Sequence, residues 1–141
     1  MNLIKKISKE ISIFGIVLII FIGLFTYRYF TFKDFSTINE TKLTQMIEEK
    51  EDFVVVLGDS TNNTTIAYQD ILTQFTTDNR NIPVYFVDKN ENNKFDDYVK
   101  KTFDMNVTYP TTLVIKDGKV AAKKEQPLSY YNLTDFITEN Y

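Results

Sequence analysis

Residues 108–120 read TYPTTLVIKDGKV, and this stretch decides the fold of the chain. Pro110 opens a run of β-branched and apolar residues. The dipeptide Asp117-Gly118 then supplies a strong signature of a tight hairpin turn, and a second short run follows it. The sequence therefore predicts an antiparallel β-hairpin over 111–121 that is entered through a proline.

Upstream of the hairpin, apolar runs alternate with helical patterns. The runs 53–57 and 82–87 are continuously apolar and rich in β-branched residues, which is typical of strands buried on both faces. A short strand at 35–38 is compatible with the pattern. Apolar residues at helical spacing predict amphipathic helices at 39–50, 61–75, 95–103 and 128–141. This alternation predicts an α/β domain whose first strands are parallel.

The first part of the chain has a different character. Residues 11–25 carry no charge, and aromatic residues extend the apolar stretch to Phe32. About 20 such residues are the length that a helix needs to cross the hydrocarbon core of a bilayer. Bulky residues follow where a cleaved signal peptide requires small ones, so we favour an uncleaved anchor over a signal peptide. We divide the chain into a basic N-terminus (1–10), a transmembrane anchor (11–32) and a C-terminal domain (34–141).

The charges indicate an orientation and a class of partner. Three lysines precede the anchor, whereas only Arg28 and Lys33 flank its other end. The positive-inside rule therefore favours a single-pass cell-membrane protein with a cytosolic N-terminus and an extracytoplasmic domain. From Asp34 onward, 11 basic and 18 acidic residues leave a net charge of −7. Such a domain would be repelled by nucleic-acid phosphates, and basic peptides are better electrostatic partners.

The order of elements and the proline-led hairpin resemble the thioredoxin superfamily over nearly all of residues 34–141. The chain is most similar to the membrane-anchored, bacteriocin accessory-type thioredoxin-like proteins of Gram-positive bacteria. These carry a Gly-x-x-x-Cys-x-x-Cys segment, and residues 58–65, GDSTNNTT, match it apart from both cysteines. The resemblance implies a three-layer α/β sandwich with a mixed central sheet. It also implies a cis bond between Tyr109 and Pro110, which costs little before proline.

The redox chemistry of the superfamily does not carry over, because the chain contains no cysteine and no histidine. The dithiol positions fall on Asn62 and Thr65, or on Thr61 and Thr64 if the alignment shifts by one residue; we prefer the first. Amide and hydroxyl side chains cannot exchange disulfides. The buried acid that assists proton transfer in thioredoxins falls at Val56. We therefore predict no disulfide oxidoreductase activity and no cofactor.

One polar loop, 88–93, resembles the first half of an EF-hand calcium loop. Asn93 replaces the required glycine, and Val99 stands where the bidentate glutamate is needed. We therefore predict no metal site, and we interpret the loop as a polar turn that caps the next helix.

Without redox chemistry, the resemblance still implies a scaffold that can bind a peptide. In the superfamily, backbone groups beside the proline pair with an extended peptide, a form of strand addition. We hypothesise a non-enzymatic module that holds an exported peptide or a partner membrane protein, in bacteriocin export or in another secretion or conjugation machine. The alternatives are a bacteriocin immunity protein, a vestigial partner of a redox-active paralogue, or a purely structural role for the proline. The candidate binding residues are Asp59, Ser60, Asn62, Asn63, Thr64, Thr65, Tyr109 and Pro110.

Overall fold

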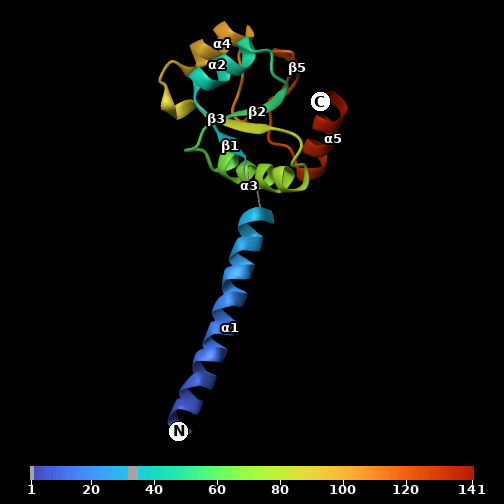
Figure 1. Cartoon of the computed structure of the whole chain (residues 1–141). Helices are drawn as coiled ribbons and strands as arrows, with labels where there is room; N and C mark the ends of the chain where they lie inside the picture. Colours follow the sequence, from blue (N-terminus) through green and yellow to red (C-terminus); the bar gives the residue numbers. More distant parts are fainter. Residues whose placement is uncertain (1, 32–34) are drawn as a thin grey trace. The chain divides into compact units, whose positions relative to one another are not determined.

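The structure is a computed structural model that describes residues 2–31 and 35–141, with side chains for 2–27 and 35–141. It divides into two compact units, Met1–Lys33 and Asp34–Tyr141 (Figure 1).

The described part of the first unit is one helix, α1 (Asn2–Thr31). Its stretch Asn2–Tyr27 is long and apolar enough to cross a membrane. The helix therefore begins before the anchor predicted at 11–32, and Phe32 lies outside the described residues. The side chains of Arg28, Tyr29 and Phe30 are not among the described ones.

Residues 35–141 form a five-stranded mixed sheet in the order β1-β3-β2-β4-β5. The strands β1, β3 and β2 are parallel to one another, and β4 runs antiparallel to both β2 and β5. This arrangement confirms the parallel strands and the antiparallel hairpin predicted from the sequence. The strands are β1 (Ser36–Thr37), β2 (Phe53–Gly58), β3 (Val84–Asp88), β4 (Thr111–Lys116) and β5 (Lys119–Lys124).

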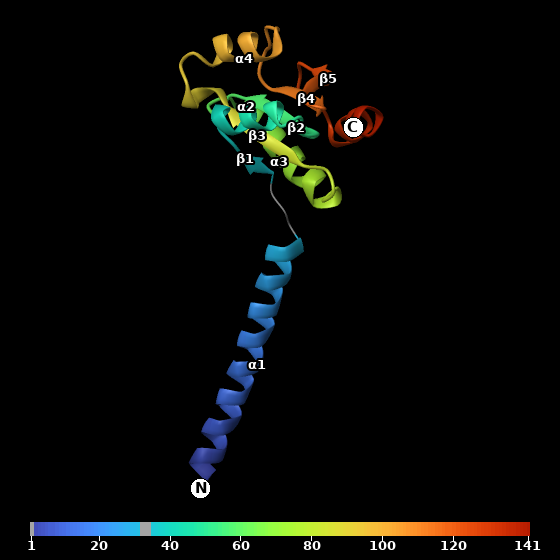
Figure 2. The same cartoon turned by 45° about the horizontal axis from the view of Figure 1, so that its top comes forward.

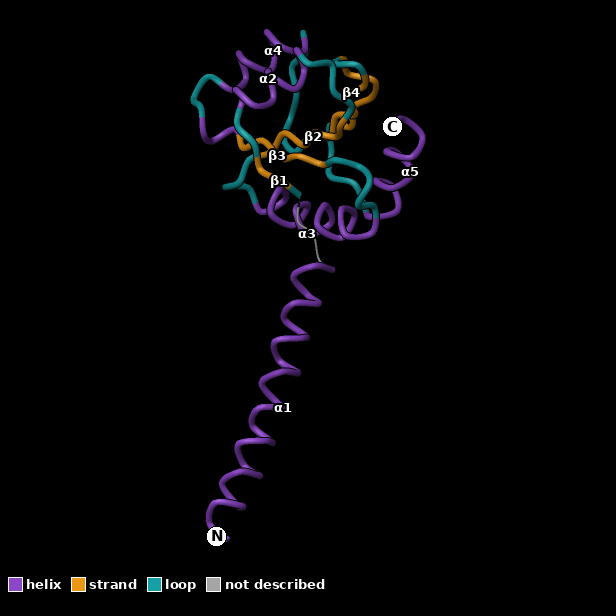
Figure 3. The backbone as a smooth tube through the Cα atoms, in the orientation of Figure 1, coloured by secondary structure: helices purple, strands orange, loops and turns teal. Residues whose placement is uncertain are grey.

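Helices cover both faces of the sheet, as Figures 1 and 2 show from two directions, and Figure 3 shows the sheet between them. The three-layer α/β sandwich predicted for the domain is confirmed. The helices α2 and α4 lie on one face, and α3 and α5 lie on the other. Their bounds are α2 (Glu40–Glu48), α3 (Asn63–Asp78), α4 (Phe95–Phe103) and α5 (Tyr130–Asn140).

The central strand β2 supplies side chains to both hydrophobic layers because side chains alternate along a strand. Val54 and Val56 pack with α3 and α5, whereas Phe53, Val55 and Leu57 pack with α2 and α4. Every residue of β2 is buried. The continuously apolar run in the sequence is the consequence of this burial on both faces.

The hairpin has the geometry that its sequence predicts. The Tyr109–Pro110 peptide bond is cis. At the turn, Asp117 has φ 54° and Gly118 has φ 70°, the left-handed pair typical of a two-residue hairpin turn. A Cβ atom at position 118 would lie 2.4 Å from the Ile47 carbonyl oxygen, so glycine is required there for space as well as for conformation.

Several boundaries differ from the prediction. The second strand begins at Val84 rather than at residue 82, and α3 runs from Asn63 to Asp78 rather than over 61–75. The 88–93 loop is a polar turn, as predicted, and it contains the 3-10 turn η1 (Lys89–Glu91). The prediction that this loop caps the next helix is wrong, because the capping position of α4 is Lys94, which makes no side-chain capping hydrogen bond.

Candidate functional site

Three elements meet where the sequence places the candidate site. The register pairs Leu57 of β2 with Thr111 of β4, so the next step along both strands brings Gly58 level with Pro110. A Cβ atom on Gly58 would lie 2.5 Å from the ring of Phe86 and 2.8 Å from the Thr65 methyl group. The end of β2, the first turn of α3 and the cis-proline are therefore packed tightly together.

Asn62 is the residue that caps α3. Its side-chain oxygen accepts a hydrogen bond from the Thr64 backbone N–H at 2.8 Å, which satisfies one of the free N–H groups at the helix start. Asn62 and Thr64 are exposed, but Thr65 is fully buried. The Thr65 hydroxyl oxygen accepts from the Asp59 backbone N–H at 3.3 Å. In the preferred register, one former dithiol position is thus an exposed helix cap and the other is a buried hydroxyl.

The loop between β2 and α3 is held by a network that reaches the end of β3. The Asn90 side-chain amide donates to Asp59 at 2.7 Å and to Asp88 at 2.9 Å. The Ser60 backbone N–H donates to Asp88 at 3.2 Å, and the Thr61 hydroxyl donates to Asp59 at 2.6 Å. Hydrogen bonds from Asn90 and then from Thr61 lower the pKa of Asp59 to about 2.

Sequence reasoning missed Asp88 and Asn90 as members of this region. Their position in the sequence could have revealed them, because Asp88 and Asn90 lie at the end of the second parallel strand. The carboxyl ends of adjacent parallel strands meet at one edge of a sheet. The register indeed pairs Gly58 with Asp88, which places Asp59 beside η1.

Tyr109 directs its side chain toward α4. Its hydroxyl donates to Asp96 at 2.5 Å, and its ring centroid lies 5.9 Å from that of Phe95. The Lys89 ammonium lies 4.9 Å from the centre of the Tyr109 ring, within the range of a cation–π contact. Partial burial and then the Asp96 carboxylate raise the pKa of Tyr109 above its ordinary value.

Beneath the site, the Tyr68 and Thr112 hydroxyls lie 2.7 Å apart and join α3 to β4. Pro110 is also buried. Of the predicted site residues, Thr65 and Pro110 therefore lie below the surface, and Tyr109 belongs to the α4 side. We call the remaining five the polar rim: Asp59, Ser60, Asn62, Asn63 and Thr64.

The polar rim contains hydroxyl, amide and carboxylate groups and no thiol, since the sequence has no cysteine. Among the described residues, no group of three or more histidine, cysteine, aspartate or glutamate side chains is placed to hold a metal ion. The rim can donate and accept hydrogen bonds, but it has no group that could undergo thiol–disulfide exchange.

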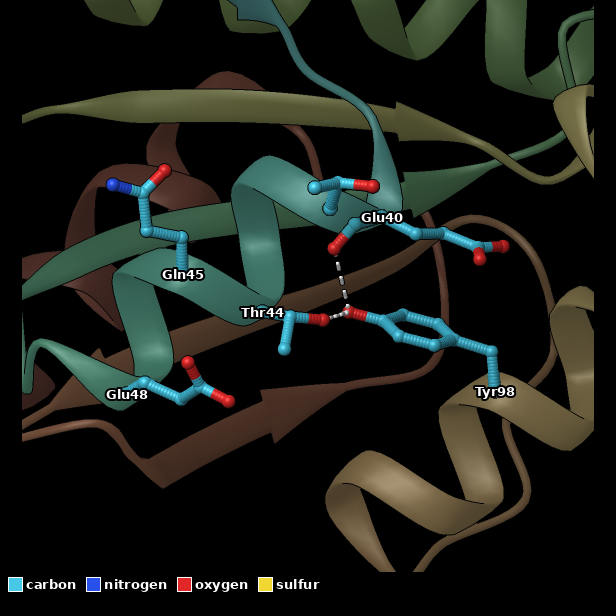
Figure 4. Close-up of a pocket in the computed structure, with 6 residues that line it drawn as sticks. Glu40, Thr44, Gln45, Glu48 and Tyr98 are labelled. Atoms are coloured by element: carbon cyan, nitrogen blue, oxygen red, sulfur yellow. Dashed lines mark hydrogen bonds between the residues drawn. The ribbon is translucent and has the colours of Figure 1, made fainter.

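A second concave region lies between α2 and α4 (Figure 4). Its volume is about 570 Å³. The Tyr98 hydroxyl lies 2.8 Å from the Thr44 hydroxyl and donates to the Glu40 carbonyl oxygen at 3.1 Å. Burial raises the pKa of Tyr98. These bonds join the two helices, and Thr41, Gln45 and Glu48 complete the lining.

Comparison with known proteins agrees with this fold. The sequence from residue 36 to residue 127 matches the family model of the monothiol bacilliredoxin BrxC, a segment that includes the polar rim and the proline hairpin. The chain belongs to the BrxC family. No curated protein matches it in sequence. The name of the BrxC family refers to a single thiol, whereas this member has none.

Solved thioredoxins share the fold. The Fasciola hepatica thioredoxin superposes with a TM-score of 0.61 at 17% identity, covering 75% of this chain and 99% of that one. Oxidised thioredoxin O1 from Arabidopsis thaliana gives a TM-score of 0.60 at 11% identity, covering 77% and 99%. At such identities the likeness shows the thioredoxin-like fold alone, so the role of this BrxC-family member must be argued from its own residues.

Proposed function

We propose that this BrxC-family protein is a membrane-anchored, redox-inactive docking module that holds an exported peptide or a partner membrane protein. The observation that carries the proposal is the exposed, thiol-free start of α3, which packs against the end of β2 at the level of Pro110. Exposed hydrogen-bonding side chains without a thiol favour a binding role over a catalytic one.

The polar rim supports this role through its composition. Four of its five residues carry neutral hydrogen-bonding side chains, and Ser60, Asn62, Asn63 and Thr64 are exposed. An extended segment that lies beside Thr108 and Tyr109 would meet these side chains. The buried Thr65 and the Tyr68–Thr112 hydrogen bond lie beneath this surface.

The anchor and the charge complete the proposal. The apolar helix α1 holds the domain at the cell membrane, with the basic N-terminus in the cytosol. The net charge of −7 from Asp34 onward favours a basic partner. The setting we propose is peptide-bacteriocin export, or assembly of another secretion or conjugation machine.

Photo-crosslinking in the native membrane tests the polar rim. The full-length protein carries a photoreactive amino acid at Thr64, and a matched protein carries it at Gln74, which is exposed farther along the same helix. We expect an exported peptide or a membrane protein to be captured at position 64 and not at position 74. Asn63→Arg in the position-64 protein should reduce that capture at least several-fold.

Equal capture at both positions, or none at position 64, would contradict the proposal. Capture of a cysteine-bearing thioredoxin-like protein would instead favour the role of a partner to a redox-active paralogue. Bacteriocin resistance conferred by this gene alone would favour immunity.

A further inference from the structure

The strand β5 is an open edge of the sheet. It is the last strand in the order and pairs with β4 on its inner side. Among residues 35–141, no further strand pairs with its outer side. An edge strand presents a row of backbone N–H and C=O groups that can accept another strand.

A groove runs along this edge. Its volume is about 550 Å³, and five consecutive β5 residues, Lys119–Lys123, line it. Phe103, the last residue of α4, and Met105, two residues beyond it, line it as well. Both are half-buried in the hydrophobic layer under α4. Five residues of extended chain span about 16 Å, so the groove offers a backbone edge and an apolar wall to a short strand.

Basic side chains outnumber acidic ones at this edge, where the Lys123 ammonium lies 4.0 Å from the Glu125 carboxylate. The domain from Asp34 onward has 11 basic residues, and five lie on β5 or in the last turns of α4: Lys100, Lys101, Lys119, Lys123 and Lys124. All five are exposed. Lysines on an edge strand oppose pairing with a second copy of the same strand, because like charges would then face each other. The positive charges of these lysines are complementary to a strand that carries acidic side chains.

The pairing of β5 with β4 determines the distance between Lys119 and Lys123, and so the spacing of acidic groups that a bound strand would need. Lys119 pairs with Lys116, and Lys123 pairs with Leu113, three residues away on β4, because a β-bulge opposite Val114 and Ile115 takes up one residue of β5. The two lysines are therefore separated by about three strand steps, or about 10 Å. In an added strand, two acidic side chains three residues apart match this separation.

We infer that the β5 edge binds a short acidic segment of a partner protein as a sixth strand. Backbone pairing with β5 supplies the affinity, an apolar side chain of the segment packs on Phe103 and Met105, and its two carboxylates meet Lys119 and Lys123. This surface is distinct from the polar rim and takes a partner of opposite charge.

The test uses the full chain in lipid nanodiscs and a labelled peptide, acetyl-TEVTEVT-amide, followed by fluorescence anisotropy at low salt. Two further peptides serve as controls: TKVTKVT, and a TEVTEVT peptide N-methylated at alternate amides so that it cannot pair. We expect saturable binding of the acidic peptide and at least tenfold weaker binding of both control peptides. Hydrogen exchange of the β5 amides should slow when the acidic peptide is bound.

Matched variants separate the edge from general electrostatics. Lys119→Glu with Lys123→Glu should weaken binding of the acidic peptide at least tenfold. Lys42→Glu with Lys94→Glu changes the net charge equally at exposed positions outside the groove, and it should change binding less than about threefold.

Three results would overturn the inference: no binding at millimolar peptide, equal binding of the N-methylated peptide, or equal loss in the two double variants. Asn63→Arg should leave peptide binding unchanged, so this test is independent of the polar rim.

Discussion

Replacing Tyr68 with phenylalanine removes one hydroxyl from beneath the candidate site. Tyr68 is 1% exposed, Thr112 is 0% exposed, and their hydroxyls lie 2.7 Å apart. The change leaves the buried Thr112 hydroxyl without this partner, which should lower the free energy of unfolding by about 1–3 kcal/mol at pH 7. Thr112→Val should cost a similar amount, and the double variant should show a coupling energy of about 1 kcal/mol.

The same pair predicts a dependence on pH. Burial raises the pKa of Tyr68 to about 12, against an ordinary value of 10.0. A raised pKa in the folded state means that the stabilisation is fully present below pH 10 and is lost as the pH rises toward 12. Two pKa units correspond to a loss on the order of 2–3 kcal/mol, which Tyr68→Phe should not suffer. The advantage of the wild type over the variant should therefore shrink and disappear between pH 10 and pH 12.

Urea unfolding of residues 34–141, monitored by circular dichroism at pH 7, 9, 10, 11 and 11.5, measures both effects. Tyr131→Phe is the matched control, because Tyr131 is 79% exposed. An unchanged difference between wild type and Tyr68→Phe from pH 7 to pH 11.5 would refute the pH argument. Strictly additive single variants would refute the coupling between α3 and β4.

Three further predictions follow from the same geometry. Gly58→Ala places a methyl group 2.5 Å from the Phe86 ring and 2.8 Å from Thr65, so calorimetry should show destabilisation by about 1–3 kcal/mol; an unchanged melting temperature would contradict the close packing. The pKa of Asp59 is lowered to about 2, so the stabilisation that its carboxylate provides is present at neutral pH and lost as the pH falls from about 4 toward 2. In an acid titration, Asp59→Asn should therefore lose less stability than the wild type. Identical acid profiles of the two proteins would argue against the network. Removal of α1 (Asn2–Thr31) should move the protein from the membrane pellet to the soluble fraction; a truncated protein that still pellets with membranes would show another attachment.

Local chemistry explains which parts of the fold could be predicted from the sequence. The strand β2 has no exposed residue, so its apolar run is unambiguous. Asp117-Gly118 forms the predicted turn. Both features depend on only a few neighbouring residues. The cis Tyr109–Pro110 bond was expected from the family resemblance and not from the local residues.

The parts that escaped prediction depend on residues far apart in the chain. Asn90 bonds to Asp59 across 31 positions, and Tyr109 bonds to Asp96 across the connection between α4 and β4. Only the parallel register of β2 and β3 brings the first pair together. The direction of the Tyr109 side chain likewise depends on where α4 packs, which periodicity alone does not determine. Because Thr65 and Pro110 are polar or turn-forming by type, their burial also could not be inferred from residue type.

The bonds that Asn90 makes to the loop before α3 have a thermodynamic consequence for any partner. A loop that must order on binding loses conformational entropy, and this loss weakens the complex. Here Asp59 and Ser60 are already fixed by hydrogen bonds in the free protein. Preorganisation of this kind leaves most of the ordering cost on the incoming chain. An unstructured peptide should therefore bind with a larger unfavourable entropy than a partner whose contacting strand is already formed.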